Sequence, residues 1–323
     1  MPKVYIIILN YGNWADTLEC LTSVFQLGYE NFAVIVVDNA SPNDSLAKMT
    51  DWAEGKLSGE IKINVGLNSD IKRPIPYIKL TGDEAKQAKL TDSPPPLIFI
   101  GLNDNIGFAG GSNVGARLAL KLGADYIWFL NNDTVVAKDS LTELVNVAEN
   151  DKSLGILGSK LVYYHNLGEV QSLGGRYNKF LGTTSMLKAE GEPDFIVGAS
   201  MLTPRKFLTD VGLMGEDYFL YYEEIDWAIR ARNRYKLKTV SASLVYHKEG
   251  ASTLGSDRAK KEKSVTSDYY AIRSRLMVTK KYFPHLLPTV TLGLFVTAFN
   301  RIRRHQFDRL PMIFKIWKQV IFG

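Results

Sequence analysis

Short runs of consecutive apolar residues, alternating with segments of helical spacing, constrain the fold of this chain more than any other feature. Segments with helical spacing cover residues 15–27, 45–57 and 109–122. Strands that are apolar on both faces and alternate with helices form a mostly parallel sheet with helices on both faces. The first half therefore predicts an α/β fold. Its buried strands are expected at Val4–Leu9, Ala33–Val37, Leu97–Gly101 and Tyr126–Leu130.

Polar residues follow the ends of these predicted strands. Asn10 and Tyr11 follow the first strand, Asp38 the second, residues 103–111 the third and residues 131–133 the fourth. In parallel α/β sheets, ligands bind beyond the carboxyl ends of the strands. We therefore expect these four polar clusters to share one edge of the sheet and to line one site.

The rest of the chain is less regular. Residues 66–96 carry five prolines and read as a loop-like insertion. Residues 155–203 read as strands with glycine-rich turns. A helix is expected at Glu223–Tyr235 and a strand at Thr239–Tyr246, and residues 257–283 read as helical and basic.

Charge is concentrated near the C-terminus. The net charge of the 323 residues is +5, and the last quarter holds most of the clustered Lys and Arg. The apolar run Leu286–Phe299 is shorter than the roughly 20 residues that a spanning helix needs. With its cationic borders it suits a membrane interface, although a core helix followed by a surface helix is the alternative. The chain has one cysteine, Cys20, and we read no export signal in residues 1–9.

Two clusters in the first half have a functional and a structural interpretation. Asp38 can accept hydrogen bonds from a base or a ribose, but the sequence around it is also typical of an Asx turn. In the segment 103–115, the residues Asn105, Gly107 and Phe108 open a glycine-rich helix start. Such a start can approach a phosphate, or it can be a plain turn, and it matches neither common nucleotide-binding loop.

Three further clusters carry carboxylates or a histidine. In FLNNDTVV, Asp133 can bind Mg²⁺ or Mn²⁺ beside Asn131 and Asn132, or the segment can be a turn. His247 can be a metal ligand or a structural histidine. The helix start at 223–226 offers a general base, or acids that simply suit the helix dipole. Its acids are Glu223, Glu224 and Asp226.

The order of these motifs resembles that of the family 2 inverting glycosyltransferases, and especially the rhamnosyltransferase-like members that build bacterial surface polysaccharides. The resemblance covers about residues 3–285. It rests on the motifs NYGNWADTLECL, VDNASPNDS, NIGFAGGSNVG, LNNDT, VGASMLTP, FLYYEEIDWAIR and YHKEGAST. It implies a GT-A fold with a Rossmann-like sheet. The implied catalytic domain covers residues 1–255, divided into a nucleotide-sugar half (1–135) and an acceptor half (136–255), and a basic helical region follows at 256–323.

The resemblance also implies roles for individual residues. Glu224 corresponds to the catalytic base, usually an aspartate, with Glu223 as its rival and Asp226 orienting the acceptor or the helix. Asp133 and His247 correspond to the metal ligands. The donor is expected to contact Asn10, Tyr11, Asp38, Asn105, Gly107, Phe108, Asn131 and Asn132, with Arg273 near the diphosphate.

The implied donor is dTDP-L-rhamnose, with UDP-galactofuranose, UDP-galactose or UDP-glucose as alternatives. The expected acceptor is a glycan on a polyprenyl diphosphate carrier. The enzyme is expected to be cytoplasmic and peripherally bound to the inner face of the cell membrane. An anionic membrane surface is then the expected partner of the basic tail, rather than nucleic acid, and an oligomer is possible. The rival functions are a nucleotidyltransferase, whose lysine-bearing loop is not seen after residue 10, and a non-catalytic nucleotide-sugar-binding scaffold.

Overall fold

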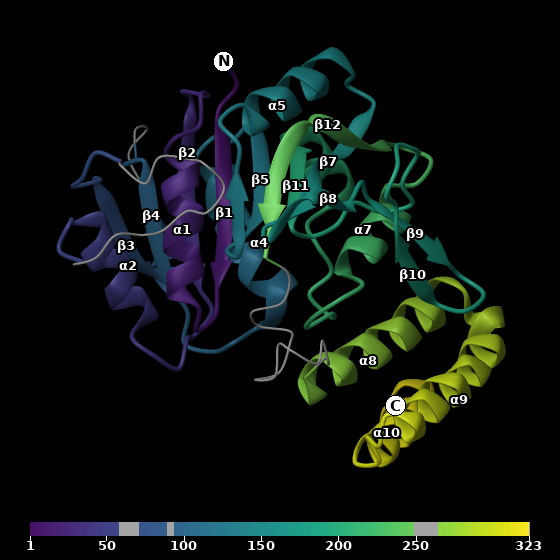
Figure 1. Ribbon diagram of the computed structural model, residues 1–323. Helices are drawn as coiled ribbons and strands as arrows, with labels where there is room; N and C mark the ends of the chain where they lie inside the picture. Colours follow the sequence, from purple (N-terminus) through teal and green to yellow (C-terminus); the bar gives the residue numbers. More distant parts are fainter. Residues whose placement is uncertain (58–70, 89–93, 249–263, 323) are drawn as a thin grey trace.

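The computed structural model describes residues 1–57, 71–88, 94–248 and 264–322. A large mixed sheet runs through the molecule, and helices cover both of its faces (Figure 1). Three C-terminal helices lie at one end of the structure, away from the N-terminal half of the sheet. Within the described residues, no helix combines the length and apolar character needed to cross a membrane.

Five parallel strands form the N-terminal half of the sheet, in the order β3-β4-β2-β1-β5. Alternate residues of β1 point to opposite layers: Ile6 and Ile8 pack with α1 and α2, whereas Tyr5 and Ile7 pack with α4. This alternation confirms the predicted helices on both faces. The elements are β1 (Val4–Asn10), α1 (Trp14–Val24), β2 (Phe32–Asp38), α2 (Ser45–Ala53), β3 (Tyr77–Thr81), β4 (Leu97–Gly101), α4 (Gly107–Lys121) and β5 (Tyr126–Asn131).

The second half of the sheet is mixed, because β11 enters antiparallel between β5 and β7. Beyond β7 come β12, which is parallel to it, and the short edge strand β6; β8 also pairs with β7. The strands are β6 (Thr134–Val136), β7 (Leu154–Tyr163), β8 (Asn166–Ser172), β11 (Ser200–Pro204) and β12 (Lys236–His247), and a separate hairpin comprises β9 (Gly175–Asn178) and β10 (Thr183–Met186). The helices are α5 (Ser140–Asn150), α6 (Arg205–Val211) and α7 (Glu223–Ala231).

The loop-like interpretation of residues 66–96 is wrong for the part that the structure describes. This part contains the edge strand β3 (Tyr77–Thr81) and the helix α3 (Gly82–Gln87). The side chains of Thr81 and Glu84 form a capping box that starts the helix directly after the strand. The alternating residues of YIKLT suit a half-exposed edge strand, which the nearby prolines concealed. Residues 66–70 and 89–93 lie outside the described residues.

Several helices end earlier than their apolar pattern predicts. The helix α1 ends at Val24 rather than residue 27, and α2 ends at Ala53 rather than residue 57. The helix α7 ends at Ala231 rather than residue 235, because Asn233 adopts the left-handed conformation that turns the chain toward β12.

The C-terminal region contains α8 (Val265–Tyr282), a short 3₁₀ turn (Pro284–Leu286), α9 (Leu287–Arg303) and α10 (Arg309–Phe322). The predicted helical segment 257–283 is therefore confirmed from residue 265, and residues 257–263 lie outside the described residues. An apolar cluster that includes Leu276, Leu294 and Ile316 joins the three helices. The buried carboxylate of Asp268 on α8 receives Arg301 at 2.6 Å and Arg309 at 3.1 Å, which fixes α9 and α10 against α8.

Candidate active site

The first part of the site lies where β1 and β2 end side by side. Asn10 is the register partner of Asp38, and its Nδ2 donates to Asp38 Oδ1 at 2.6 Å. The backbone N–H of Ser41 donates to Asp38 Oδ2 at 3.1 Å. Both Asn10 and Asp38 are buried, and Tyr11 is exposed beside them. A carboxylate in a fixed orientation next to an exposed aromatic ring can bind and stack a nucleobase.

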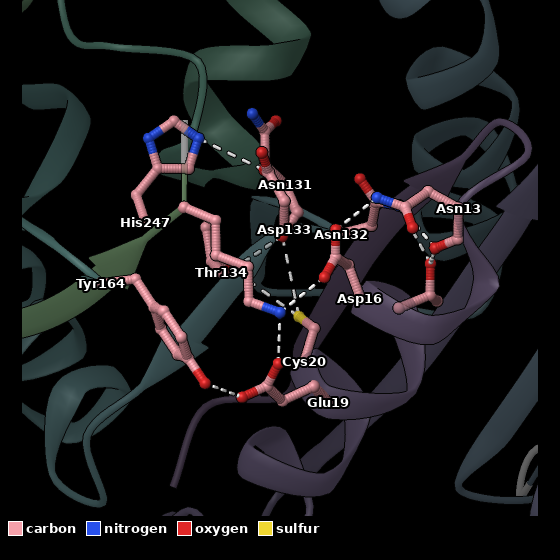
Figure 2. A network of polar contacts seen from close by, with 12 residues as sticks. Asn13, Asp16, Glu19, Cys20, Asn131, Asn132, Asp133, Thr134, Tyr164 and His247 are labelled. Carbon is pink, nitrogen blue, oxygen red and sulfur yellow. Dashed lines mark hydrogen bonds and ion pairs between the residues drawn. The ribbon is translucent and has the colours of Figure 1, made fainter. Parts of the chain in front are cut away.

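The end of β5 is tied to two neighbouring elements. The backbone N–H of Asn131 donates to the carbonyl of Ala199 at 3.0 Å. The Asn132 side chain turns toward the start of α1, where its Nδ2 donates to Thr17 Oγ1 at 3.0 Å (Figure 2). Thr17 in turn donates to Asn10 Oδ1 at 2.9 Å. These contacts give Asn132 a positioning role, and direct contact of Asn131 or Asn132 with a substrate stays a prediction.

Asp133 and His247 meet beyond the ends of β5 and β12 (Figure 2). His247 Nε2 lies 3.2 Å from Asp133 Oδ1, and Nδ1 lies 2.8 Å from Gln171 Oε1. Because an amide oxygen can only accept, Nδ1 carries the proton, and in the neutral ring Nε2 turns a lone pair toward the carboxylate. Two acceptor atoms that face each other suit a shared cation, and Gln171 orients the ring as outer partners of metal-binding histidines do.

This pair fits a divalent ion that also binds phosphate. Among residues 1–57, 71–88, 94–248 and 264–322, no three His, Cys, Asp or Glu side chains gather as a larger metal cluster. Mg²⁺ is typically held by one or two protein groups, with substrate phosphates and water completing its shell. Asp133 and His247 can supply such a partial set, as the sequence predicted, and their role as ligands stays a proposal.

Lys248 is a residue of the site that the sequence analysis missed. Its ammonium donates to Asp16 Oδ1 at 2.5 Å and contacts Glu19, and its backbone N–H donates to the carbonyl of Asp133 at 3.0 Å. Burial opposes its charge, but the hydrogen bonds to Asp16 and Glu19 outweigh burial and raise the pKa of Lys248. Lys248 therefore holds the end of β12, and with it His247, against α1.

The same corner contains the chain's single cysteine. Cys20 is buried on α1, and its Sγ lies 3.6 Å from Thr134 Oγ1. Burial raises the pKa of the Cys20 thiol to about 12. A thiol that stays protonated is inert, so Cys20 serves packing rather than catalysis.

The glycine-rich segment holds a neighbouring loop. Gly107 opens α4 with a φ of +79°, and a Cβ added there would clash with the Phe219 carbonyl. The N–H of Phe108 donates to that carbonyl at 2.8 Å, so this N–H is already used within the protein. The Asn39 amide donates to Asn105 Oδ1 at 2.8 Å, which fixes the segment to the end of β2. The donor contacts predicted for Asn105, Gly107 and Phe108 stay predictions.

The loop held in this way leads into the two adjacent glutamates. Tyr221 and Tyr222 both have positive φ, at +67° and +70°, just before α7 begins at Glu223. Bulky residues rarely adopt this conformation, and consecutive examples concentrate where a site demands them. The turn directs Glu223 and Glu224 so that the Oε2 atom of each is buried, with no hydrogen-bond partner in the part of the chain that the structure describes.

Both glutamates resist ionisation. Burial, followed by the charge of Glu224, raises the pKa of Glu223 well above its usual value. Burial raises the pKa of Glu224 to about 7, although backbone hydrogen bonds oppose the shift. Near neutral pH, Glu224 is therefore poised to take or release a proton. Such a carboxylate is suited to general base catalysis.

Asp226, one turn further along α7, has a different environment. Its buried carboxylate accepts from Tyr282 at 2.6 Å, Arg230 at 2.7 Å and Lys281 at 2.8 Å. Burial opposes the charge, but these hydrogen bonds outweigh it and lower the pKa of Asp226. Of the two roles expected for Asp226, the contacts favour orienting the helix, because the carboxylate joins α7 to α8.

Arg273 lies on α8 and contacts the loop before α7. Its guanidinium donates to the carbonyl of Asp217 at 3.2 Å. It lines a pocket of about 590 Å³ between this loop, α8 and α10, together with Lys280 and Lys281. The contact of Arg273 with the donor diphosphate stays a prediction.

Short links join the polar clusters along one edge of the sheet. The backbone N–H of Asn131 is hydrogen-bonded to the carbonyl of Ala199. The neighbouring Gly198 lies against Phe108, because a Cβ added at Gly198 would be 3.6 Å from the Phe108 ring. The backbone N–H of Phe108 is hydrogen-bonded to the carbonyl of Phe219, which lies four residues before Glu223. The structure thus connects the Asp133–His247 corner to the Glu223–Glu224 pair through two intervening segments, at the edge where the sequence predicted one site.

Comparisons with known proteins agree with this architecture. Residues 5–65 and 81–212 match the family described as "Glycosyl transferase family 2". Among curated proteins, the chain is 22% identical over 173 residues to the low-salt glycan biosynthesis hexosyltransferase Agl10 of Haloferax volcanii. This match covers 51% of the chain and 56% of that relative, so the chain spans little more than half of the relative's length.

Two solved structures share the fold at low sequence identity. The mannosyltransferase PcManGT from Pyrobaculum calidifontis, in complex with GDP-Man and Mn²⁺, has a TM-score of 0.55 and 15% identity, covering 99% of this chain and 84% of its own. S. aureus TarS 1-349 in complex with UDP-GlcNAc also has a TM-score of 0.55 and 15% identity, covering 99% of this chain and 80% of its own. The predicted GT-A fold is thereby confirmed.

Proposed function

The chain belongs to glycosyl transferase family 2, and we propose that it transfers a sugar from a nucleoside diphosphate to an acceptor hydroxyl with inversion at the anomeric carbon. One observation carries the proposal. Glu223 is buried and Glu224 is half-buried at the start of α7, and among the described residues the Oε2 atom of neither has a hydrogen-bond partner. They lie at the sheet edge that also bears Asp38 and the Asp133–His247 corner. In this assignment residues 1–135 bind the donor and residues 136–255 bind the acceptor.

Glu224 acts as the general base in this proposal. Its carboxylate takes the proton of the acceptor hydroxyl while that oxygen forms a bond to the anomeric carbon. The bond from this carbon to the diphosphate breaks in the same displacement, and the nucleoside diphosphate leaves with the electron pair. Glu223 limits the negative charge beside the base, because burial and the charge of Glu224 raise its pKa.

The donor is held at the carboxyl ends of β1, β2 and β5. Asp38, fixed by Asn10, receives the base or ribose, and the exposed ring of Tyr11 stacks against it. Asp133 and His247 would hold Mg²⁺ or Mn²⁺, which supplies positive charge to the leaving diphosphate when bound. Lys248 keeps His247 in place through Asp16 and Glu19.

The donor sugar that we propose first is L-rhamnose, from dTDP-L-rhamnose, on the strength of the motif order. UDP-galactofuranose and UDP-hexoses are the alternatives. The Haloferax relative is a hexosyltransferase, and the two solved structures hold GDP-Man and UDP-GlcNAc, so these donors belong in any test. The acceptor that we propose is a glycan on a polyprenyl diphosphate carrier, which places the enzyme at the cytoplasmic face of a membrane.

The test is donor turnover across a panel of nucleotide sugars with Mg²⁺, Mn²⁺ or chelator, in wild type, Asp133→Ala and the exposed control Asp83→Ala. We expect metal-dependent use of one donor, with a loss of about 100-fold or more in Asp133→Ala and none in Asp83→Ala. Binding of a donor without turnover would favour the scaffold function. Failure of every donor to bind in a metal-dependent way would contradict the transferase proposal.

A further inference from the structure

The helix α9 is apolar on two opposite faces. Val290 and Leu294 are buried against α8 and α10. At 100° per residue, five other apolar residues fall within an arc of about 120° on the opposite side of the helix. This α9 stripe comprises Leu292, Phe295, Val296, Phe299 and Ile302, which are 64%, 71%, 62%, 59% and 44% exposed.

Such a stripe differs from the scattered apolar residues that any protein surface carries. A helix that is apolar on both sides is normally covered on both, and a continuous exposed apolar face marks an interaction surface. The α9 helix is too short to cross a bilayer, so a spanning helix does not explain the stripe. In Figure 1, α9 and α10 lie beyond α8 as seen from the sheet, at the end of the molecule.

The charge around the stripe has one sign. Residues 284–322 contain six Lys and Arg side chains and a single acidic residue, Asp308. Arg301 and Arg309 are paired with Asp268. The other four cations are exposed, at Arg303, Arg304, Lys315 and Lys318. An apolar helix face with a cationic border matches an anionic lipid surface, where acyl chains receive the apolar face and headgroup phosphates receive the cations.

We propose that the α9 stripe lies in the interfacial layer of an anionic bilayer, with α9 parallel to the membrane plane. Arg303 falls within the arc of the stripe and would meet the headgroup phosphates first. A second copy of the chain fits this surface less well, because a two-fold contact would bring the same cationic border against itself. The proposal does not depend on the transfer activity, since it concerns binding of the protein to lipid alone.

The attachment of α8 gives this surface a consequence for the site. Ser274 on α8 donates to the carbonyl of Leu220 at 3.0 Å, and Tyr270 stacks on Phe219 with ring centroids 4.4 Å apart. The same helix carries Asp268, which holds α9 and α10. A bilayer bound to α9 is therefore connected through α8 to the loop that leads into Glu223 and Glu224.

The experiment is flotation of the full chain with vesicles of phosphatidylcholine, with or without phosphatidylglycerol, in the absence of donor and acceptor. We expect binding to the anionic vesicles that weakens with added salt, and at least tenfold weaker binding to neutral ones. The variant Phe295→Gln/Phe299→Gln should lose about tenfold or more in binding. The matched control Leu167→Gln/Met186→Gln removes two exposed apolar side chains of the catalytic part and should bind as wild type does.

A second pair of variants tests the charge. Arg303→Gln/Arg304→Gln should weaken binding to anionic vesicles, whereas Lys152→Gln/Lys206→Gln, which removes two exposed cations on the catalytic part, should not. Circular dichroism and thermal unfolding establish that each variant is folded. The proposal is overturned if the wild-type protein does not float with anionic vesicles. It is also overturned if the Phe295→Gln/Phe299→Gln variant floats as well as the wild type. A concentration-dependent dimer in light scattering that those changes abolish also overturns it, in favour of a second copy.

Discussion

At the scale of single residues, the two adjacent glutamates have the same chemistry but different local roles. Burial, followed by the charge of Glu224, raises the pKa of Glu223. Glu224, with a pKa near 7, can be ionised at neutral pH at modest cost. The sequence left the choice between them open, since burial is a property of the folded chain. The pKa of Glu224 near 7, and the charge of Glu224 that raises the pKa of Glu223, favour Glu224 as the base.

The first prediction distinguishes the two glutamates by activity. Glu224→Gln should lower kcat by about 10²–10⁴-fold, because no carboxylate then accepts the hydroxyl proton. Glu224→Asp should retain more activity than Glu224→Gln, and Glu223→Gln should retain most of it. In wild type the rate should rise with pH through an apparent pKa near 7, as Glu224 loses its proton. An inactive Glu223→Gln beside an active Glu224→Gln would reverse the assignment.

The second prediction concerns stability, because the raised pKa of Glu224 has a thermodynamic cost. Between the usual glutamate pKa of 4.5 and about 7, the folded chain retains a proton that the unfolded chain has released. The contribution of Glu224 to the free energy of unfolding therefore falls as pH rises from 4.5 to about 7. Glu224→Gln removes the cost and should raise the free energy of unfolding by about 1–3 kcal/mol at pH 8 and by little at pH 4.5.

Denaturant unfolding at the two pH values measures this difference. The exposed Glu30→Gln is the matched control and should show no such pH-dependent gain. A Glu224→Gln variant that is no more stable than wild type at pH 8 would mean that the carboxylate is not desolvated in the folded protein.

At the scale of elements, the start of α4 depends on a close approach that only glycine permits. Gly107 and Gly123 both have φ near +80°, but a Cβ at Gly107 would clash with the Phe219 carbonyl, whereas one at Gly123 would meet nothing within 4 Å. Gly123→Ala should therefore cost about 1 kcal/mol from backbone strain alone. Gly107→Ala should cost about 2–4 kcal/mol and also lower activity, because it displaces the loop before Glu223. Equal unfolding free energies for the two variants would contradict this account.

The same scale shows which elements the sequence could predict. Strands such as Val4–Asn10 are apolar on both faces, so their pattern has one interpretation. The edge strand Tyr77–Thr81 is half exposed and surrounded by prolines, so its pattern resembles a loop. The contacts of Lys248 with α1 and of Asp226 with α8 join residues 232 and 55 positions apart, which no local pattern reveals. The clustering at the strand ends was predictable, because parallel strands share one carboxyl edge.

At the scale of the whole molecule, the last two helices are joined by buried charge to α8, which in turn contacts the loop before α7. Asp268 on α8 is the shared counter-charge of Arg301 on α9 and Arg309 on α10. Asp268→Asn leaves the buried Arg309 and the half-buried Arg301 without a counter-charge, which costs about 3–5 kcal/mol in comparable cases. We expect α9 and α10 to exchange amide hydrogens much faster in this variant, whereas β1, β2 and β5 stay protected.

Hydrogen exchange followed by mass spectrometry reports on both regions in one experiment. Asp308→Asn removes an exposed acid of the same tail and should leave the exchange of α9 and α10 unchanged. Uniform loss of protection across the sheet and the tail would show that the helical cluster and the sheet unfold as one unit.

The burial of Cys20 makes the chain a convenient host for site-specific spectroscopic labels. Its thiol is enclosed and its pKa is raised to about 12, so maleimide reagents should leave the folded protein unmodified. A cysteine introduced at an exposed position of α10 and another near β3 would then be the reactive thiols of the folded chain. Fluorophores or spin labels placed there would record how the tail moves relative to the nucleotide-binding half, without any need to remove the native thiol.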